Sequence, residues 1–495
     1  MEKRRIDIVT LDNYAVMGVT AIMLWLFPLY TRGGFFGIQV AKLQIMTATL
    51  MVGITLLVLF RLTKPKQYLA TFRQRGDVPA RKMDIVILSF TVIAALSTFL
   101  SPYAMEALTG FSQEVRIGRV QGFVVILMYL IFYLLISKKL EYKSWLLDGF
   151  LIFGGVASVL AVLNAYSIDP LGFYLNVMPQ ERATFISTIG NINTFSSLAC
   201  MLVALNLYFY ARSENLWMQV IYGFLLVINS GGLISAKSDS GLFAWAVLSA
   251  VMLIYFARWR EERLRFLEGM ALTILTFGVI GYTQPGIGGL WGKICHLHGW
   301  AVLLGLLVIF YFSVRIFGGE PSLRKAMGVL VGLGVALLLM FVVAVNLLGL
   351  KVGGLEEDFL FGEHWGSGRM ELYSAAWEIF TSLDLKSQLI GYGPDTYGIL
   401  TEEAGVTYST STHSEYLQYL VTLGWLGLIT YCIFIASAMV MGFRQGRGSV
   451  GVGLAFACLA YSLQAIFNIN QILTTPIFFI LLAVMMATVY RKEKQ

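Results

Sequence analysis

Long apolar runs recur along the whole of this 495-residue chain, separated by short polar breaks. A helix needs about 20 mostly apolar residues to cross a bilayer, and these runs have that length. Only 13% of the residues are charged, against about 25% in soluble domains, so a separate soluble domain is not expected. The sequence predicts an all-α polytopic membrane protein with 12 to 14 transmembrane helices. The fourteen runs lie at 14–31, 41–60, 84–100, 121–137, 146–165, 192–210, 217–234, 240–256, 267–283, 299–317, 326–350, 420–442, 450–467 and 471–490.

Basic residues gather in alternate breaks between these runs. The break at 61–83 is strongly basic. If successive breaks alternate between the two sides of the membrane, those on the same side as 61–83 carry further Lys and Arg, as at 258–265 and 491–494. Cytoplasmic loops of membrane proteins have this excess of positive charge. We therefore expect both termini in the cytoplasm. The net charge of +7 is then explained by topology, and nucleic acid is not expected as a partner.

One long hydrophilic segment, 351–419, interrupts the pattern and falls on the opposite, extracytoplasmic side. It divides the chain into an N-terminal helix bundle (1–350), this loop, and the C-terminal helices (420–495). The loop is acidic, so Arg369 within it is not accounted for by topology. Apolar residues from Met370 to Phe380 recur at helical spacing, which suits either a helix at the membrane surface or a packing helix.

His413 is the candidate general base. Thr412 and Glu415 have the spacing of a capping box, which would open a helix with His413 in its first turn. The helix dipole disfavours a protonated imidazole there, and a neutral imidazole can accept a proton. A structural or solvated histidine is the alternative. His296 and His298 form a His-x-His pair without evident carboxylate partners, so no metal site and no cofactor are predicted.

Four motifs in order along the chain resemble the O-antigen ligase and O-antigen polymerase family of bacterial membrane glycosyltransferases. His413 to Gly427 resembles the family's His-(Asn/Ser)-x-Tyr-Leu-Gln…Gly-x-x-Gly-Leu signature, which includes Tyr416, and Arg369 with Gly391-Tyr-Gly393-Pro394 resembles a second segment. The other two are Thr188-Ile-Gly190-Asn191-Ile-Asn193, similar to an element that opens a helix in the family, and Ser101-Pro102 followed by Arg119-Val-Gln-Gly122.

The resemblance implies a GT-C-like helical membrane enzyme. The lack of a convincing metal cluster and the presence of outer Arg residues predict that it needs no metal. Such an enzyme transfers a glycan from a polyprenyl-pyrophosphate carrier to a hydroxyl of a glycan or lipid acceptor, at the outer face of the cytoplasmic membrane. His413 would take the hydroxyl proton. Arg369 would stabilise the leaving pyrophosphate, and Arg119, Arg182 and Lys237 are the other candidates for that contact. Arg119 and Arg182 could instead reach lipid headgroups.

The chain departs from the family where many members have Ser-Arg-Gly, since it reads Ser238-Asp239-Ser240. A donor-binding Arg is then missing or is replaced by Lys237, Arg182 or Arg119. The runner-up function is a flippase for lipid-linked oligosaccharides, which would keep its functional charges in a central cavity between helix bundles. A non-catalytic scaffold would leave the ordered motifs unexplained. The sequence leaves open whether the acceptor makes this a ligase or a polymerase.

Overall fold

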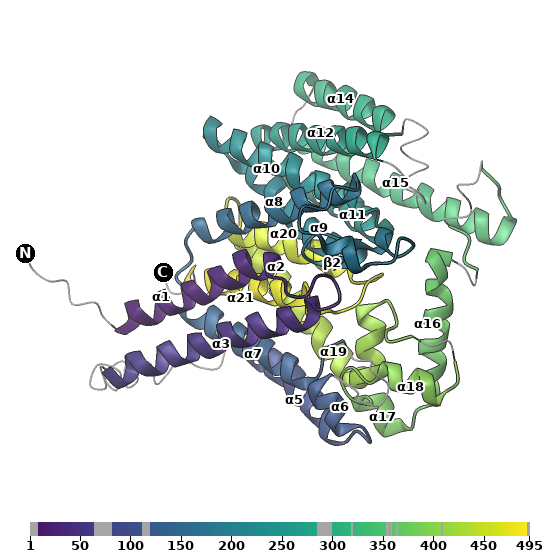
Figure 1. Ribbon diagram of the computed structural model, residues 1–495. Helices are drawn as coiled ribbons and strands as arrows, with labels where there is room; N and C mark the ends of the chain where they lie inside the picture. Colours follow the sequence, from purple (N-terminus) through teal and green to yellow (C-terminus); the bar gives the residue numbers. More distant parts are fainter. Residues whose placement is uncertain are drawn as a thin grey trace, which may run out of the picture.

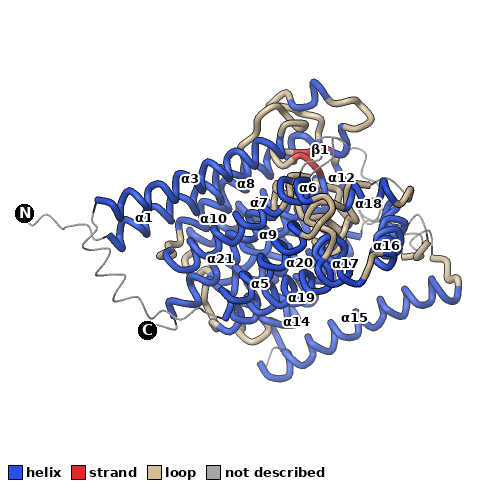
Figure 2. The backbone as a smooth tube through the Cα atoms, turned by 90° about the horizontal axis from the view of Figure 1, so that it is seen from below, coloured by secondary structure: helices blue, strands red, loops and turns tan. Residues whose placement is uncertain are grey.

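The computed structural model describes residues 8–63, 82–110, 119–284, 299–317, 320–352, 356, 359–362, 365–406 and 409–492. Within them the chain is almost entirely helical, with one two-stranded antiparallel sheet, β1 (Phe185–Ile186) and β2 (Gly190–Asn191). The long helices run side by side along one axis (Figures 1 and 2). The chain is an all-α polytopic membrane protein, as the sequence predicts.

The elements follow one another with these bounds. The N-terminal half has α1 (Ile8–Ala21), η1 (Ile22–Leu26), α2 (Phe27–Leu29), α3 (Ile38–Thr63), α5 (Lys82–Phe99), α6 (Ala104–Thr109), α7 (Phe123–Lys139), α8 (Trp145–Ala165), η2 (Phe173–Asn176), η3 (Arg182–Thr184), α9 (Ile192–Arg212) and α10 (Leu216–Ser235). The remainder has α11 (Asp239–Phe256), α12 (Arg260–Thr283), α14 (Gly299–Phe317), α15 (Glu320–Leu348), α16 (Trp365–Ser382), α17 (Leu385–Ile390), α18 (Tyr397–Glu403), α19 (Glu415–Arg444), α20 (Val450–Gln464) and α21 (Thr475–Lys492).

Every predicted span coincides with a helix or, for the first, with the continuous run α1–η1–α2. Among the described residues, ten helices are long and apolar enough to cross a membrane, and α14, α20 and α21 provide shorter apolar stretches. The remaining predicted span, α7, has 17 residues. The helix expected around 369–380 is α16, but α19 begins at Glu415, inside the predicted loop 351–419.

Helices α9, α20 and α21 form the centre of the bundle (Figure 1), and their side chains are buried on nearly all faces. The span in α9 has 83% of its residues buried, whereas the more hydrophobic α15 has 6%. In water such exposure would be costly, but a helix that satisfies its own backbone hydrogen bonds can present apolar side chains to lipid. The outer helices are therefore explained by the bilayer, and the core by protein packing.

The short helices α16, α17 and α18 and the sheet lie at the end of the bundle opposite the start of α1 (Figures 1 and 2). The helices alternate in direction, so the connections around 100–122, 166–191, 236–238 and 465–474 reach this same end. We call it the loop end. The predicted extracytoplasmic segment and all the predicted site residues belong to it.

Candidate active site

The site is built on a close contact between the Gly391–Gly393 turn and a break in α19. Helix α19 is interrupted at Gly424, which has a φ of 67°. This frees the carbonyl of Thr422 to accept the Gly393 backbone N–H at 2.9 Å. A Cβ at Gly391 would lie 2.1 Å from the Thr422 carbonyl oxygen, and one at Gly424 would meet the backbone at 2.4 Å. The glycines of the motif are thus required by backbone approach.

That turn places Asp395, which fixes a second loop. Its Oδ2 accepts the backbone N–H groups of Arg119 at 2.8 Å and Gln121 at 3.0 Å. A Cβ at Gly110 would lie 2.9 Å from the same oxygen, so this glycine also leaves room for the contact. Burial raises the pKa of the Asp395 carboxyl to about 6, against the lowering effect of the two N–H groups and the Arg119 charge.

The Arg119 side chain then reaches the segment that carries His413. Its Nε and Nη2 donate to the Thr410 hydroxyl at 3.0 and 2.6 Å. Burial lowers the pKa of the Arg119 guanidinium to about 10, and the Asp395 charge opposes this shift. At that pKa the guanidinium keeps its charge at neutral pH.

The second cation, Arg369, is the fifth residue of α16 and begins its second turn. Its Nη1 donates to the Gly366 carbonyl at 3.0 Å, while its buried Nε has no hydrogen-bond partner within the described ranges. One turn further on, the hydroxyl of Tyr373 donates to the carbonyl of His413 at 3.4 Å. Helix α16 therefore has two roles: it positions Arg369, and through Tyr373 it contacts the backbone of His413. The structure brings Arg369, Arg119 and His413 into one cluster, in which both arginines are near enough to affect the pKa of the histidine.

The imidazole of His413 is held neutral at physiological pH. Burial lowers its pKa to about 4, with smaller effects from the positive charges of Arg119 and Arg369. None of its hydrogen bonds is made by the ring, among the residues that the structure describes; its backbone N–H donates to Ser411. The φ of His413 is 53°, a left-handed conformation that non-glycine residues adopt rarely and most often at functional sites.

The prediction of a capping box is wrong, and so is the prediction that His413 lies in the first turn of a helix. Helix α19 begins at Glu415 with Ser414 as N-cap, so His413 precedes the helix. Glu415 does not reach back to Thr412, because its carboxylate is fully buried and accepts the hydroxyls of Tyr431 and Tyr461. Burial and two arginines, rather than a place in the first turn, lower the His413 pKa.

The other motif residues have structural roles. Gly190, with a φ of 95°, lies in β2, and Asn191 is the N-cap of α9, accepting the N–H groups of Asn193 and Thr194 at 2.9 and 3.2 Å. The prediction that this motif opens a helix is confirmed. Tyr416 donates its hydroxyl to the Ser462 carbonyl at 2.9 Å and so joins α19 to α20.

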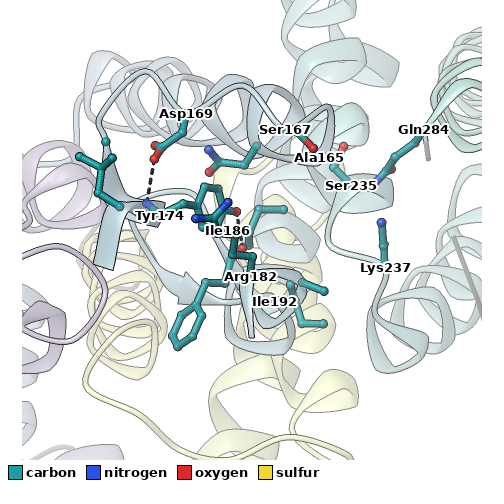
Figure 3. Close-up of a pocket in the computed structure, with 15 residues that line it drawn as sticks. Ala165, Ser167, Asp169, Tyr174, Arg182, Ile186, Ile192, Ser235, Lys237 and Gln284 are labelled. Carbon is teal, nitrogen blue, oxygen red and sulfur yellow. Dashed lines mark hydrogen bonds between the residues drawn. The ribbon is translucent and has the colours of Figure 1, made fainter. Parts of the chain in front are cut away.

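Arg182 and Lys237 line a separate pocket of about 560 Å³ at the loop end (Figure 3). Arg182 belongs to η3, and its Nε donates to the Val177 carbonyl at 3.3 Å. Lys237 lies between α10 and α11, and burial lowers the pKa of its ammonium group. Asp239, which stands where the family often has Arg, is the exposed first residue of α11. The structure therefore divides the four predicted cations into two pairs.

Several site residues were missed from the sequence. Asp395 follows the Gly-Tyr-Gly-Pro turn directly, and Thr410 and Tyr373 lie three and four residues from His413 and Arg369, so proximity to the motifs was the available signal. His296 and His298 lie outside the described residues. Among the described residues no group of three or more His, Cys, Asp and Glu side chains could hold a metal ion.

The fold and the cluster at its loop end define a multi-pass membrane protein with a neutral histidine close to two arginines. Residues 298–432 match the family model described as O-antigen ligase, and both Arg369 and His413 lie within this segment. This match over about a quarter of the chain agrees with the resemblance seen in the motifs of the same segment. The match does not extend to Arg119, Arg182, Lys237 or the Gly190–Asn191 element. Among curated proteins, none matches the chain.

Proposed function

We propose that this chain is a bacterial membrane glycosyltransferase of the O-antigen ligase and polymerase type. It transfers a glycan from a polyprenyl-pyrophosphate carrier to an acceptor hydroxyl in the synthesis of a cell-surface polysaccharide. The observation that carries the proposal is the cluster of His413, Arg119 and Arg369, two of which lie in the segment that matches the family. A flippase would need charged groups along a central path between helix bundles, whereas this cluster lies at one end.

In the proposed reaction, a ring nitrogen of His413 accepts the proton of the acceptor hydroxyl. The oxygen forms its bond to the anomeric carbon of the glycan while the bond from that carbon to the pyrophosphate oxygen breaks. A low pKa keeps the imidazole neutral and able to accept the proton at neutral pH. The carrier leaves as the polyprenyl pyrophosphate.

Arg369 stabilises the charge that develops on the leaving pyrophosphate. Its buried Nε has no hydrogen-bond partner among the described residues, so it can donate to a ligand together with a neighbouring guanidinium N–H. Arg119 contributes charge and holds the Thr410 segment in place. These cations take the role that a divalent metal has in other glycosyl transfers, so we propose that the reaction is metal-independent. Arg182 and Lys237 are treated below.

The proposal is tested with His413→Ala in a transfer assay that uses lipid-linked donor and acceptor extracted from the source membranes, with excess chelator present. General-base catalysis contributes about 10²–10⁴-fold, so the rate should fall by that factor. Glu378→Ala, an exposed change on α16, is the control and should keep full activity. Normal turnover by His413→Ala contradicts the assignment. Wild-type activity that chelator abolishes and magnesium or manganese restores contradicts metal independence.

We also propose that the loop end faces outward from the cytoplasmic membrane and that both termini are cytoplasmic. The basic breaks at the opposite end support this orientation. A single cysteine introduced at Glu402 in α18 should react with a membrane-impermeant maleimide in intact spheroplasts, and one introduced at Arg444 only after lysis. Labelling in the reverse order would place the site in the cytoplasm, where this transfer does not occur.

A further inference from the structure

The pocket that contains Arg182 and Lys237 is lined by uncharged hydrogen-bonding groups as well. Gln284, at the C-terminal end of α12, is 5% exposed, and neither its amide oxygen nor its amide nitrogen has a hydrogen-bond partner in the described part of the chain. Ser235, at the end of α10, is 2% exposed, and its hydroxyl also has no partner among those residues. Figure 3 shows Gln284, Ser235 and Lys237 on one side of the pocket, with Arg182 and Tyr174 on the other. Buried polar groups of this kind are normally satisfied.

The combination of groups indicates what would satisfy them. An amide both donates and accepts, and a hydroxyl does the same, so Gln284 and Ser235 match the hydroxyl groups of a sugar. Tyr174 and Phe185 add aromatic surface to the same pocket. Lys237 and Arg182 supply two positive charges. The volume of about 560 Å³ lies within the range of small-molecule sites.

A pyrophosphate group alone fits these residues less well. The pocket also contains the carboxylate of Asp169, which accepts the Tyr174 backbone N–H at 2.7 Å, and an ionised pyrophosphate has no hydrogen-bond donor to offer it. Asp169 can instead accept from a sugar hydroxyl. The cations that act on His413 are Arg119 and Arg369, and neither lines this pocket. The leaving group has to be next to His413, so this pocket suits a part of the substrate away from the bond that breaks.

We propose that this pocket binds an anionic saccharide, the glycan portion of one substrate of the transfer reaction. The inference rests on the proposed function and assigns Lys237 and Arg182 to an acidic group on the sugar instead of the donor pyrophosphate. Gln284 and Ser235 bind sugar hydroxyls. The backbone is strained on both sides of the pocket, since Ser167 and Lys237 have φ values of 63° and 52°. Such strain is retained where the position of a side chain matters.

The experiment measures binding to purified full-length protein without any transfer. The probes are hexuronate oligosaccharides, phosphorylated oligosaccharides, the neutral counterpart of each, and inorganic pyrophosphate, titrated by calorimetry. At least one anionic oligosaccharide should bind, with its neutral counterpart about tenfold weaker or more. Gln284→Leu and Lys237→Met should each weaken binding by about tenfold, because each removes a buried hydrogen-bond partner or a charge. His413→Ala should bind as the wild type does, which separates this result from the test of catalysis.

Gln219→Leu is the matched control, since Gln219 is a half-buried glutamine at the other end of α10. It should not change binding. If Gln284→Leu fails to fold, as thermal unfolding would show, Lys237→Met carries the test. Binding by no oligosaccharide of the panel, unaltered binding by both folded variants, or displacement by equimolar pyrophosphate would each overturn the proposal.

Competition experiments then identify whether the glycan in the pocket belongs to the donor or to the acceptor. Displacement by glycan-loaded polyprenyl pyrophosphate, with the unglycosylated carrier inactive, shows that the donor glycan occupies the pocket. Binding of the oligosaccharide that the loaded carrier does not displace shows that the acceptor glycan does. Displacement by the unglycosylated carrier shows that the pocket binds pyrophosphate and overturns the proposal.

Discussion

The two ends of the helix bundle differ in how their charged side chains are paired. The five ion pairs formed between described residues all lie at the end opposite the loops: Lys138–Asp84, Lys139–Asp12, Arg212–Glu262, Arg447–Glu262 and Arg491–Glu141. At the loop end, Arg119 donates to a hydroxyl and Arg369 to a backbone carbonyl. The first end also has Arg263 and Arg265, which donate to backbone carbonyls, but ion pairs between described residues occur at that end alone. The proposed function gives the charges of Arg119 and Arg369 to a ligand.

Backbone strain also differs between the two ends. Among the described residues, the non-glycine residues with positive φ all lie at the loop end, and they include Val120, Lys237, Asp395 and His413. Each left-handed residue costs about 1–2 kcal/mol, so packing and hydrogen bonds around it have to compensate. If the proposed function is right, stabilising ion pairs are concentrated at one end and the reaction occurs at the other. The predictions below test whether this division holds.

Among the changes that compare the two ends, the largest effect is expected from Arg369→Lys, which keeps the charge but loses the fork of N–H donors. If Arg369 binds the pyrophosphate through two N–H groups, the transfer rate should fall by about 10²–10³-fold, as for loss of one preorganised donor. The same change at the opposite end, Arg447→Lys, should leave the rate within about twofold, since Arg447 pairs with Glu262. Initial rates at saturating donor measure both. Equal losses in the two variants would remove the distinction between the ends.

The sequence is sufficient to predict the helices because their signal is local. Apolar runs of the length of a membrane predict spans whatever their neighbours do, and all fourteen coincide with helical segments. The capping box failed because a tertiary contact overrides the local pattern. Glu415 lies fully buried against Tyr431 and Tyr461, from α19 and α20, and nothing within the Thr412–Glu415 segment indicates that contact.

The candidate site shows the same limit. Arg369 and His413 stand in recognisable motifs, so their identity could be read from the chain, but their closeness depends on α16 packing beside α19. Asp395 joins segments 276 residues apart through a contact with Arg119, which no local pattern encodes. Gln284 and Ser235 end apolar spans and look like ordinary helix termini in the sequence; only their burial without partners distinguishes them.

A smaller effect is expected in the pH dependence. The neutral form of His413 is the base, and its pKa is lowered to about 4, so kcat/KM should stay constant from pH 7 to about pH 5 and decline only towards pH 4. With an unperturbed histidine as base, the enzyme would lose half its activity near pH 6.5.

Arg369→Gln removes one positive charge that lowers the pKa of His413 and should move the acid limb of the profile to higher pH. Asp395→Asn is the control, because Asp395 titrates at about pH 6 and would otherwise account for a limb there. An acid limb near pH 6 that disappears in Asp395→Asn would assign the titration to Asp395 and contradict the role given to His413.

The smallest effect on transfer is expected from Glu262→Gln, although its effect on stability should be large. The Glu262 carboxylate is fully buried and pairs with Arg212 and with Arg447 at 2.7 Å, so its loss leaves two cations without a counter-charge. Removing one partner of a buried ion pair costs about 3–5 kcal/mol, and the partial exposure of both arginines reduces this to about 1–3 kcal/mol. The melting temperature in detergent should fall, whereas the transfer rate well below it should stay within about twofold. Glu261→Gln, an exposed neighbour, should change neither. A rate that dropped tenfold in folded Glu262→Gln would show that the ion-paired end controls the catalytic end, and the division of the molecule into a stabilising end and a reactive end would be wrong.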